Sequence, residues 1–408
     1  MTPAILGDLR IVESSAFVAA PLAGMTLAQL GADVIRIDPL GGGPDAHRWP
    51  LARDGQSLYW AGLNKSKRSV EIDLTSERGQ ELATALITAP GRGGGLLLTN
   101  LPARGWRSYE ALRKLRGDLV MVALSGNRDG SSEVDYTVNS ASGFPWATGP
   151  RNLAEPSNAV LPAWDVAAGT LAAVGLLAAE RQRLSTGDGQ LVSLSLSDVA
   201  FAMVGNLGRL AEAQLGEGDQ SRDGNHVYGA FGLDFETSDG RRVMVVALTP
   251  RQWRALRDAT GIHEASARIE EATGHDLGTE GGRFAARDLL AALLRPWFAA
   301  RELPSIRDTF TSHGVCWGPY QTFRQLVSED PRCSVDNPMF AQVEHPGVGT
   351  YLTPGSPLDF SAVERLPVQR TAQLGEHTEE VLGGILGLSD VEIGRLLADG
   401  VIASRTCA

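Results

Sequence analysis

Short apolar runs alternate with segments of helical spacing through the first third of the chain. The runs predict buried strands at residues 9–13, 31–38, 69–74, 95–99 and 119–124. Helical spacing between the runs predicts helices at residues 20–30, 77–87 and 109–116. Strands alternating with helices form a mostly parallel sheet with helices on both faces, and ligands bind beyond the carboxyl ends of its strands. The fold class is therefore α/β with a Rossmann-like large domain, although no G-x-G-x-x-G motif follows the first strand to indicate a dinucleotide site.

The middle of the chain holds a long apolar helix with an acid at its start. Residues 131–162 are rich in Gly, Pro, Ser and Asn, which predicts loops, and the helix follows at residues 166–182. Asp165 directly precedes this helix. An acid there faces the positive end of the helix dipole and the unpaired N–H groups of the first turn, so a helix cap explains it as well as a catalytic role does. A strand at residues 190–196 and a second apolar helix at residues 198–215 follow.

A polar, glycine-containing linker then leads into a second region. Residues 231–237 and 242–248 flank a Ser-Asp-Gly turn, which predicts a β-hairpin, and helices are expected at residues 250–260, 282–298 and 303–312. Residues 326–377 predict few regular elements before a helical pair near 378–397, so this return segment should pack along another surface. The expected domains are residues 1–215 (large, Rossmann-like), 216–325 (small α/β with its linker) and 326–408 (a C-terminal return on the large domain).

Composition narrows the class of protein. The chain has 408 residues, of which 43% are apolar and 21% charged, as in ordinary globular proteins. Its net charge of −11 argues against a nucleic-acid or anionic-membrane partner. The N-terminus lacks a signal sequence and no apolar run reaches membrane-spanning length, so we expect a cytoplasmic location. Cys316, Cys333 and Cys407 are widely spaced and odd in number, which predicts neither a disulfide framework nor a metal site.

A set of ordered motifs carries a resemblance to a known family. They are FVAAP at residues 17–21, LGADVIRID at 30–38, NKSKRSVEID at 64–73, DVAAG at 165–169, TGDGQ at 186–190, GNH at 224–226 and Asp-Gly at 239–240. In this order and spacing they resemble the family III coenzyme A transferases over nearly the whole chain. A narrower likeness, to members that act on the dicarboxylic 2-methylfumaryl (mesaconyl) group, rests on residues 15–22, 100–106, 132–139, 161–165, 228–231 and 354–360.

The resemblance implies covalent chemistry at Asp165. In this family one Asp carboxylate attacks the acyl-CoA thioester to give a mixed anhydride, and the released CoA thiolate converts this into an aspartyl-CoA thioester. The matching position here is Asp165. A carboxylate is a competent nucleophile when it is held in line and shielded from water, and N–H groups at a helix start can stabilise the oxyanion. CoA arrives with the substrate, and no other cofactor and no metal is implied.

The resemblance and the polar loops also suggest binding residues. Because the phosphates of CoA need cations and backbone donors, the predicted phosphate contacts are Lys65, Lys67, Arg68, Asn100 and Arg104. Phe17, Val18 and Ala19 are predicted to contact the pantetheine or adenine of CoA through backbone and apolar surface. A solvated charged turn explains Lys65 and Lys67 equally well. The predicted acyl-pocket residues are Arg48, Tyr136, Asn139, His226 and Tyr228. His226 is assigned to the pocket only, because acyl exchange needs no proton relay.

Several functions are compatible with the sequence. The preferred one is intramolecular CoA transfer, in which the freed acid stays bound, turns over and accepts CoA on its other carboxyl group. The separated glycines Gly224, Gly229 and Gly232, where other members have a consecutive run, would fit a less mobile cover over the intermediate. The alternatives are intermolecular transfer to a free acid, a non-catalytic CoA-binding scaffold and an α-methylacyl-CoA racemase. The resemblance also implies an interlocked homodimer.

Overall fold

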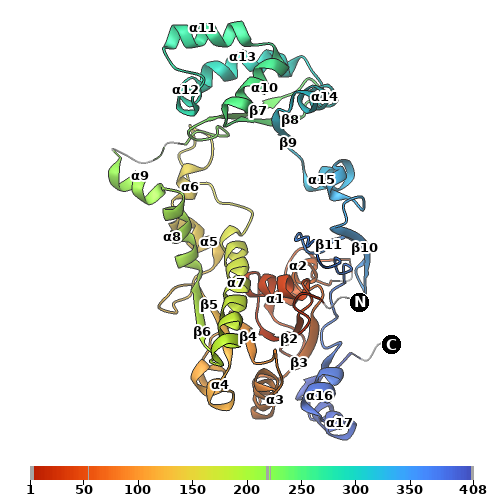
Figure 1. Cartoon of the computed structure of the whole chain (residues 1–408). Coiled ribbons are helices and arrows are strands. Elements are labelled where there is room, and N and C mark those ends of the chain that lie inside the picture. The colour runs from red at the N-terminus through yellow and green to blue at the C-terminus, as the bar shows by residue number, and fades with distance from the viewer. Residues whose placement is uncertain (1–3, 54, 217–219, 221, 406–408) are drawn as a thin grey trace. The chain divides into compact units, whose positions relative to one another are not determined.

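The computed structural model describes residues 4–53, 55–216, 220 and 222–405. The chain divides into two compact units. The larger unit comprises Met1–Ser142, Ala159–Ala211 and Pro331–Ala408, and the smaller comprises Gly143–Asn158 and Glu212–Asp330. Figure 1 shows the course of the chain through both.

Residues 143–158 belong to the smaller unit, whereas the predicted large domain of residues 1–215 included them. Side chains of the smaller unit hold this segment. The Arg222 guanidinium donates hydrogen bonds of 2.6 Å to the carbonyls of Trp146 and Leu153, and Arg151 forms an ion pair with Asp288. These contacts join positions far apart in the sequence, so the local loop composition did not indicate them.

A seven-stranded sheet forms the centre of the larger unit, in the order β12-β3-β2-β1-β4-β5-β6. Its strands are β1 (Arg10–Ser14), β2 (Asp33–Asp38), β3 (Arg68–Ile72), β4 (Leu96–Thr99), β5 (Val120–Ser125), β6 (Leu191–Ser195) and β12 (Ile402–Ala403). All pairs are parallel except β12 with β3, which are antiparallel. The predicted α/β class with a mostly parallel sheet is confirmed. The chain order changes direction between β1 and β4, which is where ligands bind in such sheets.

Helices cover both faces of this sheet. They are α1 (Ala19–Ala28), α2 (Leu58–Leu63), α3 (Glu77–Thr88), α4 (Tyr109–Leu115), α5 (Asp135–Ala141), α7 (Ala163–Thr186), α8 (Leu196–Asn206), α16 (Thr378–Leu386) and α17 (Asp390–Ala398), with 3-10 turns η1 (Pro44–His47), η2 (Gly105–Arg107) and η3 (Pro331–Cys333). Helix α7 is long and apolar enough to cross a membrane by length and composition, but it runs beside α1 and contacts β5 and β6 (Figure 1). These contacts are those of a core helix.

The opposite face of the sheet packs on helices that come from both ends of the sequence. Alternate strand residues such as Ile35, Ile37 and Met121 belong to one buried cluster with Leu82 of α3 and Val381 of α16. The C-terminal helices therefore complete the core of the larger unit.

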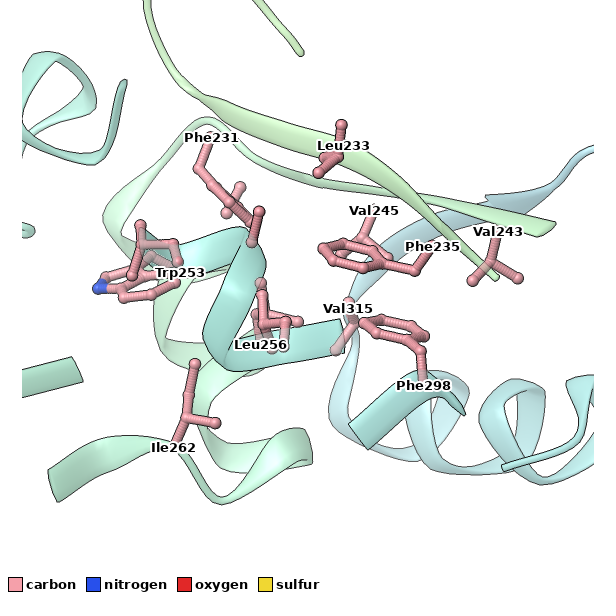
Figure 2. Packing of buried hydrophobic residues seen from close by; sticks show 14 of the residues in the cluster. Phe231, Leu233, Phe235, Val243, Val245, Trp253, Leu256, Ile262, Phe298 and Val315 are labelled. Atoms are coloured by element: carbon pink, nitrogen blue, oxygen red, sulfur yellow. The ribbon is translucent and has the colours of Figure 1, made fainter. Parts of the chain in front are cut away.

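The smaller unit is built around a three-stranded antiparallel sheet in the order β7-β8-β9. Its elements are α6 (Phe144–Ala147), β7 (Phe231–Glu236), β8 (Arg242–Ala247), α10 (Pro250–Thr260), α11 (His263–Thr273), α12 (Glu280–Ala285), α13 (Arg287–Ala299), α14 (Leu303–His313), β9 (Cys316–Pro319) and α15 (Phe323–Glu329). Figure 2 shows its core, in which the rings of Phe235 and Phe298 stack with their centroids 4.4 Å apart. The predicted hairpin is present as β7 and β8.

Several local predictions were wrong. The helix expected at residues 198–215 is divided into α8 and α9 (Arg209–Leu215) by Gly208, whose φ is +80°. The helix expected at residues 282–298 is divided between α12 and α13. The segment expected to be irregular contains the hairpin of β10 (Phe340–His345) and β11 (Gly349–Pro354). Cys316 and Cys333 are free thiols, and Cys407 lies outside the described residues.

Candidate active site

A cavity of about 350 Å³ lies at the carboxyl ends of the parallel strands of the larger unit. Residues that follow β1, β4, β5 and β6 line it, and helices α1, α7 and α8 begin at its wall. The positive ends of these helix dipoles favour negative charge at that wall. Its described lining residues are Phe17, Val18, Ala19, Arg48, Tyr59, Asn100, Leu124, Ser125, Gly126, Glu133, Val134, Asp135, Tyr136, Pro162, Asp165 and Leu196.

Asp165 lines this cavity and is not the cap of its helix. Helix α7 begins at Ala163, so Asp165 is its third residue, and the predicted helix start was three residues too late. The N-cap residue, Pro162, makes no side-chain cap; instead Oδ2 of Asp135, from α5, accepts hydrogen bonds from the backbone N–H groups of Trp164 at 2.7 Å and Asp165 at 3.0 Å. The Asp165 carboxylate accepts no hydrogen bond within the described residues, so it remains available to a substrate.

The surroundings of Asp165 favour its protonated form more than water does. Partial burial and the negative charge of Asp135 raise the pKa of Asp165, the positive charge of Arg48 opposes the rise, and the resulting pKa is about 7. A raised pKa makes the ionised carboxylate a more basic oxygen nucleophile. The same carboxylate is ionised in only part of the molecules at neutral pH.

A glycine brings α7 close to the start of α1. A Cβ atom on Gly169 would lie 2.7 Å from the carbonyl oxygen of Ala19, which is closer than real Cβ contacts come. Gly169 and Asp165 are one helical turn apart and so share a face of α7. The spacing of the DVAAG motif therefore has a structural reason, because it sets the nucleophile candidate beside the first turn of α1.

Arg48 enters the cavity between two aromatic rings. Its guanidinium lies 5.6 Å from the ring centroid of Phe17 and 5.2 Å from that of Tyr59. Phe17 has a φ of +65°, a left-handed conformation that costs a non-glycine residue roughly 1–2 kcal/mol. Arg48 forms no ion pair with a carboxylate in the described parts of the chain, and it is the only basic residue among the described lining residues. It is therefore free to bind an anionic group of a ligand.

Asn100 and the loop after β1 hold each other in place. The Asn100 Oδ1 accepts a hydrogen bond of 2.9 Å from the Ala16 N–H, and its Nδ2 donates one of 2.7 Å to the Ala16 carbonyl. This pairing positions the backbone of Phe17, Val18 and Ala19 at the cavity. These four predicted CoA contacts are thus brought together, although their contact with CoA stays a prediction.

The two lysines of the predicted CoA site, Lys65 and Lys67, are buried and do not line the described cavity. The Lys67 ammonium is buried and makes an ion pair of 2.8 Å with Glu13, a hydrogen bond of 2.8 Å to the Pro21 carbonyl and another of 2.8 Å to Asn64. Lys65 is also buried and donates to the Gly62 carbonyl at 2.5 Å. Burial lowers the pKa of each lysine to about 8. Neither lysine lies in a solvated turn, and Lys67 is committed to internal partners, of which Glu13 and Pro21 come from segments far away in the sequence.

The two predicted arginines of the CoA site are not equivalent. Arg68 is paired with Asp33 at 2.5 Å and with Glu380 at 3.2 Å. Arg104 is exposed just before η2, at the end of the loop that follows β4. Of the predicted basic residues, Arg104 is thus the one that is exposed and without an ion pair in the described structure.

The predicted acyl-pocket residues fall into different places. Tyr136 lines the cavity with Arg48. Asn139 is buried, does not line the cavity, and accepts a hydrogen bond of 3.1 Å from the indole Nε1 of Trp164. Asn139 therefore fixes the start of α7 from the buried side of α5, and its assignment to the acyl pocket stays a prediction.

His226 and Tyr228 belong to the smaller unit. The His226 Nε2 lies 3.5 Å from Asp288, and burial lowers the pKa of His226. The Tyr228 hydroxyl donates to Glu212, and its ring meets Phe284 at 5.4 Å. Their assignment to the acyl pocket stays a prediction.

Among the described lining residues that the sequence did not predict, three carry ionisable side chains, namely Tyr59, Glu133 and Asp135. Asp135 lies in the motif SEVDYTVN at residues 132–139. Its proximity to Asp165 arises only from tertiary packing, so the sequence does not indicate it. Glu133 lies in the same motif, and Tyr59 carries no local signal.

The arrangement supports nucleophilic chemistry on an activated acyl group. A carboxylate of raised pKa, a nearby cation and three helix N-termini surround one space, which suits attack on a carbonyl whose oxygen becomes negative.

The comparisons with known proteins agree with this class. The model of CoA-transferase family III matches residues 6–378, so the chain belongs to CoA-transferase family III, as the motifs predicted. 2-Methylfumaryl-CoA isomerase of Chloroflexus aurantiacus is 58% identical over 400 residues, which cover 98% of each chain. Succinyl-CoA:mesaconate CoA-transferase of Haloarcula marismortui is 28% identical over 397 residues, covering 92% of this chain and 95% of that one.

Solved structures support the fold. A CAIB/BAIF family protein from Brucella suis superposes with a TM-score of 0.76 at 23% identity, covering 94% of this chain and 100% of that one.

Proposed function

We propose that this enzyme moves CoA from the 1-carboxyl to the 4-carboxyl of one acyl group, converting 2-methylfumaryl-CoA into 3-methylfumaryl-CoA. The observation that carries the proposal is the 58% identity to 2-methylfumaryl-CoA isomerase over 98% of both chains. Asp165, with its uncommitted carboxylate at the cavity, is the nucleophile of this mechanism.

The steps balance without a proton relay. An Asp165 oxygen attacks the thioester carbon, the C–S bond breaks, and CoA leaves as a thiolate from a mixed anhydride. The thiolate then attacks the Asp165 carbonyl carbon, which releases 2-methylfumarate and leaves CoA on Asp165 as a thioester. After the acid turns over, its 4-carboxylate attacks the carbonyl carbon of the Asp165 thioester, and CoA leaves again as a thiolate from a second mixed anhydride. The thiolate then attacks the C4 acyl carbon of this anhydride, which forms the product thioester and frees the Asp165 carboxylate.

Arg48 binds the free carboxylate of the acyl group in this proposal. It is the one basic lining residue in the described cavity and has no ion pair among the described residues, so its guanidinium can form an ion pair with a substrate carboxylate. The start of α1 stabilises the oxyanion of each tetrahedral intermediate. The enzyme requires no cofactor beyond the CoA of its substrate, acts in the cytoplasm and forms a homodimer.

Mass spectrometry tests the covalent step. After brief reaction with 2-methylfumaryl-CoA, we expect CoA bound to the peptide that contains Asp165, and Asp165→Asn should carry none. Absence of this adduct in rapidly quenched, fully active enzyme would exclude the nucleophilic role.

Intermolecular transfer is the second candidate, favoured by the 28% identity to a succinyl-CoA:mesaconate CoA-transferase. Isomerisation in the presence of isotopically labelled free 2-methylfumarate separates the two. Intramolecular transfer leaves the product unlabelled, whereas label entering the CoA ester at the rate of isomerisation would support the second candidate.

A further inference from the structure

Arg36 is buried in the larger unit and joins several segments by hydrogen bonds. It lies in β2, and its side chain is 1% exposed. Its guanidinium donates to Asp38 Oδ1 at 2.9 Å, Asp45 Oδ2 at 2.9 Å, Asn64 Oδ1 at 3.0 Å and the Ser15 carbonyl at 3.2 Å. It also lies 5.8 Å from the ring centroid of Trp60. One rigid fork thus fixes the relative positions of four parts of the chain.

The segments that Arg36 joins are those that carry the Phe17, Arg48 and Tyr59 side chains. Ser15 belongs to the loop that presents Phe17. Asp45 lies in η1, and Arg48 is the residue that directly follows η1. Trp60 and Asn64 lie in and just after α2, the helix of Tyr59. No described hydrogen bond or ring contact joins Arg36 to these three side chains, but Arg36 contacts a residue within three positions of each, namely Ser15, Asp45 and Trp60.

A further hydrogen bond closes this arrangement. The Ser57 hydroxyl, which caps α2, donates to the Arg48 carbonyl at 2.6 Å, and the Arg48 N–H donates to the Asp45 carbonyl at 3.3 Å. Arg48 is therefore tied through its backbone to both η1 and α2, and both are tied to Arg36. A small displacement of either segment would move the Arg48 guanidinium.

Charge balance makes Arg36 hard to replace. Glu13, Asp38 and Asp45 are buried beside it, and Lys67 is the other buried cation that pairs within this group. A buried acid without its cation is strongly destabilising. A lysine at position 36 keeps the charge but has no planar fork to reach Asp38, Asp45 and Ser15 together.

We propose that Arg36 is a positioning residue that sets Arg48 at the cavity and thereby selects acyl groups bearing a free carboxylate. This inference rests on the proposed function. It adds that selectivity for a dicarboxylic acyl group depends on a residue that does not contact the substrate.

The experiment compares two substrates that differ in the free carboxylate, 2-methylfumaryl-CoA and methacrylyl-CoA. The readout is the second-order rate constant for formation of CoA-linked Asp165, measured by quenched mass spectrometry. We expect Arg36→Lys to lower this constant for 2-methylfumaryl-CoA at least tenfold, mainly through weaker binding, and to change it less than threefold for methacrylyl-CoA. Asp45→Asn should act in the same direction and replaces Arg36→Lys if that variant does not fold.

Arg183→Lys is the matched control. Arg183 is also a buried arginine, bonded to the Gly94 carbonyl and to Glu180, but it lies 18 positions after Asp165 on α7, about 27 Å along the helix. It should leave the preference between the two substrates unchanged. Equal losses on both substrates in Arg36→Lys and Asp45→Asn, or an unchanged preference in Arg48→Gln, would overturn the inference. Wild-type enzyme that keeps the preference but fails to isomerise 2-methylfumaryl-CoA would instead refute the proposed function.

Discussion

Replacing Asp165 with asparagine should stabilise the protein at alkaline pH while abolishing turnover. Asparagine has the same shape but no charge to desolvate. Burial raises the pKa of Asp165 from 3.8 to about 7, so the native state disfavours its ionised form. The corresponding free energy is at most about 4 kcal/mol, and partial exposure reduces it to about 2 kcal/mol.

The pH dependence follows from the direction of this pKa change. Between about pH 4 and pH 7 the unfolded carboxyl is ionised and the folded one is protonated, so the wild-type protein loses stability as the pH rises through this range. Above pH 7 both states are ionised and the loss is complete. Asp165→Asn has no carboxyl group to ionise and so avoids this loss of stability. Its free energy of unfolding should therefore exceed that of the wild-type protein by about 2 kcal/mol at pH 8 and by about half of that at pH 5.5.

Thermal unfolding of the two proteins at these pH values measures the effect. We expect the melting temperature of Asp165→Asn to exceed that of wild type by about 2 °C or more at pH 8. Asp118→Asn is a control of opposite sign, because the hydrogen bond from Arg116 lowers the pKa of Asp118 and its loss should destabilise the protein at pH 8. An advantage of Asp165→Asn that is absent, or equal at both pH values, would refute the reasoning.

Substitutions at Asp135 and Gly169 test how the surroundings of Asp165 set its charge and position. Asp135→Asn removes a negative charge beside Asp165 and should shift the acidic limb of the pH profile of kcat/KM to lower pH, since Asp135 raises the pKa of Asp165; an unmoved limb would show that the charge is unimportant. Asp135→Ala also removes the helix cap and should cost about 1 kcal/mol of stability in denaturant unfolding. Gly169→Ala should lower both the melting temperature and activity, because its Cβ would meet the Ala19 carbonyl at 2.7 Å. Gly384→Ala, in the open on α16, should instead raise stability by about 0.5–1 kcal/mol, and similar losses in both variants would contradict the packing argument.

The order of strands and helices in the larger unit could be predicted because each element has its own local pattern. The apolar runs at β1 to β6 and the motif at Asp165 are visible without tertiary information. Helix α5 was missed because its sequence, DYTVNSA, has few strong helix formers and lies among Gly, Ser and Pro. A helix cap at Asp165 was one of two interpretations left open, and Asp135 takes that role instead, which the sequence does not show because Asp135 reaches the start of α7 only after α5 has formed.

The site was harder to predict wherever charge pairing decides a role. Lys67 is a basic residue at a strand start, and only its distance to Glu13 shows that it is an internal partner. Asn139 is a polar residue in a polar segment, and only its hydrogen bond from the Trp164 indole shows that it holds the start of α7. Sequence spacing cannot indicate either, because both contacts join segments at least 25 positions apart.

The short strand β12 has a consequence for how the chain matures during synthesis. It pairs with β3 at the edge of the sheet, and Ile402 packs in the same cluster as Ile72 and Leu86. The ribosome therefore exposes most of the larger unit before the residues that cover its sheet edge have left the exit tunnel. An uncovered edge strand and an open apolar face are sites where chains associate wrongly. Nascent chains of this enzyme should consequently depend on chaperones until translation is complete, and ribosome-bound intermediates stalled before residue 378 should be more sensitive to protease than chains released after residue 403.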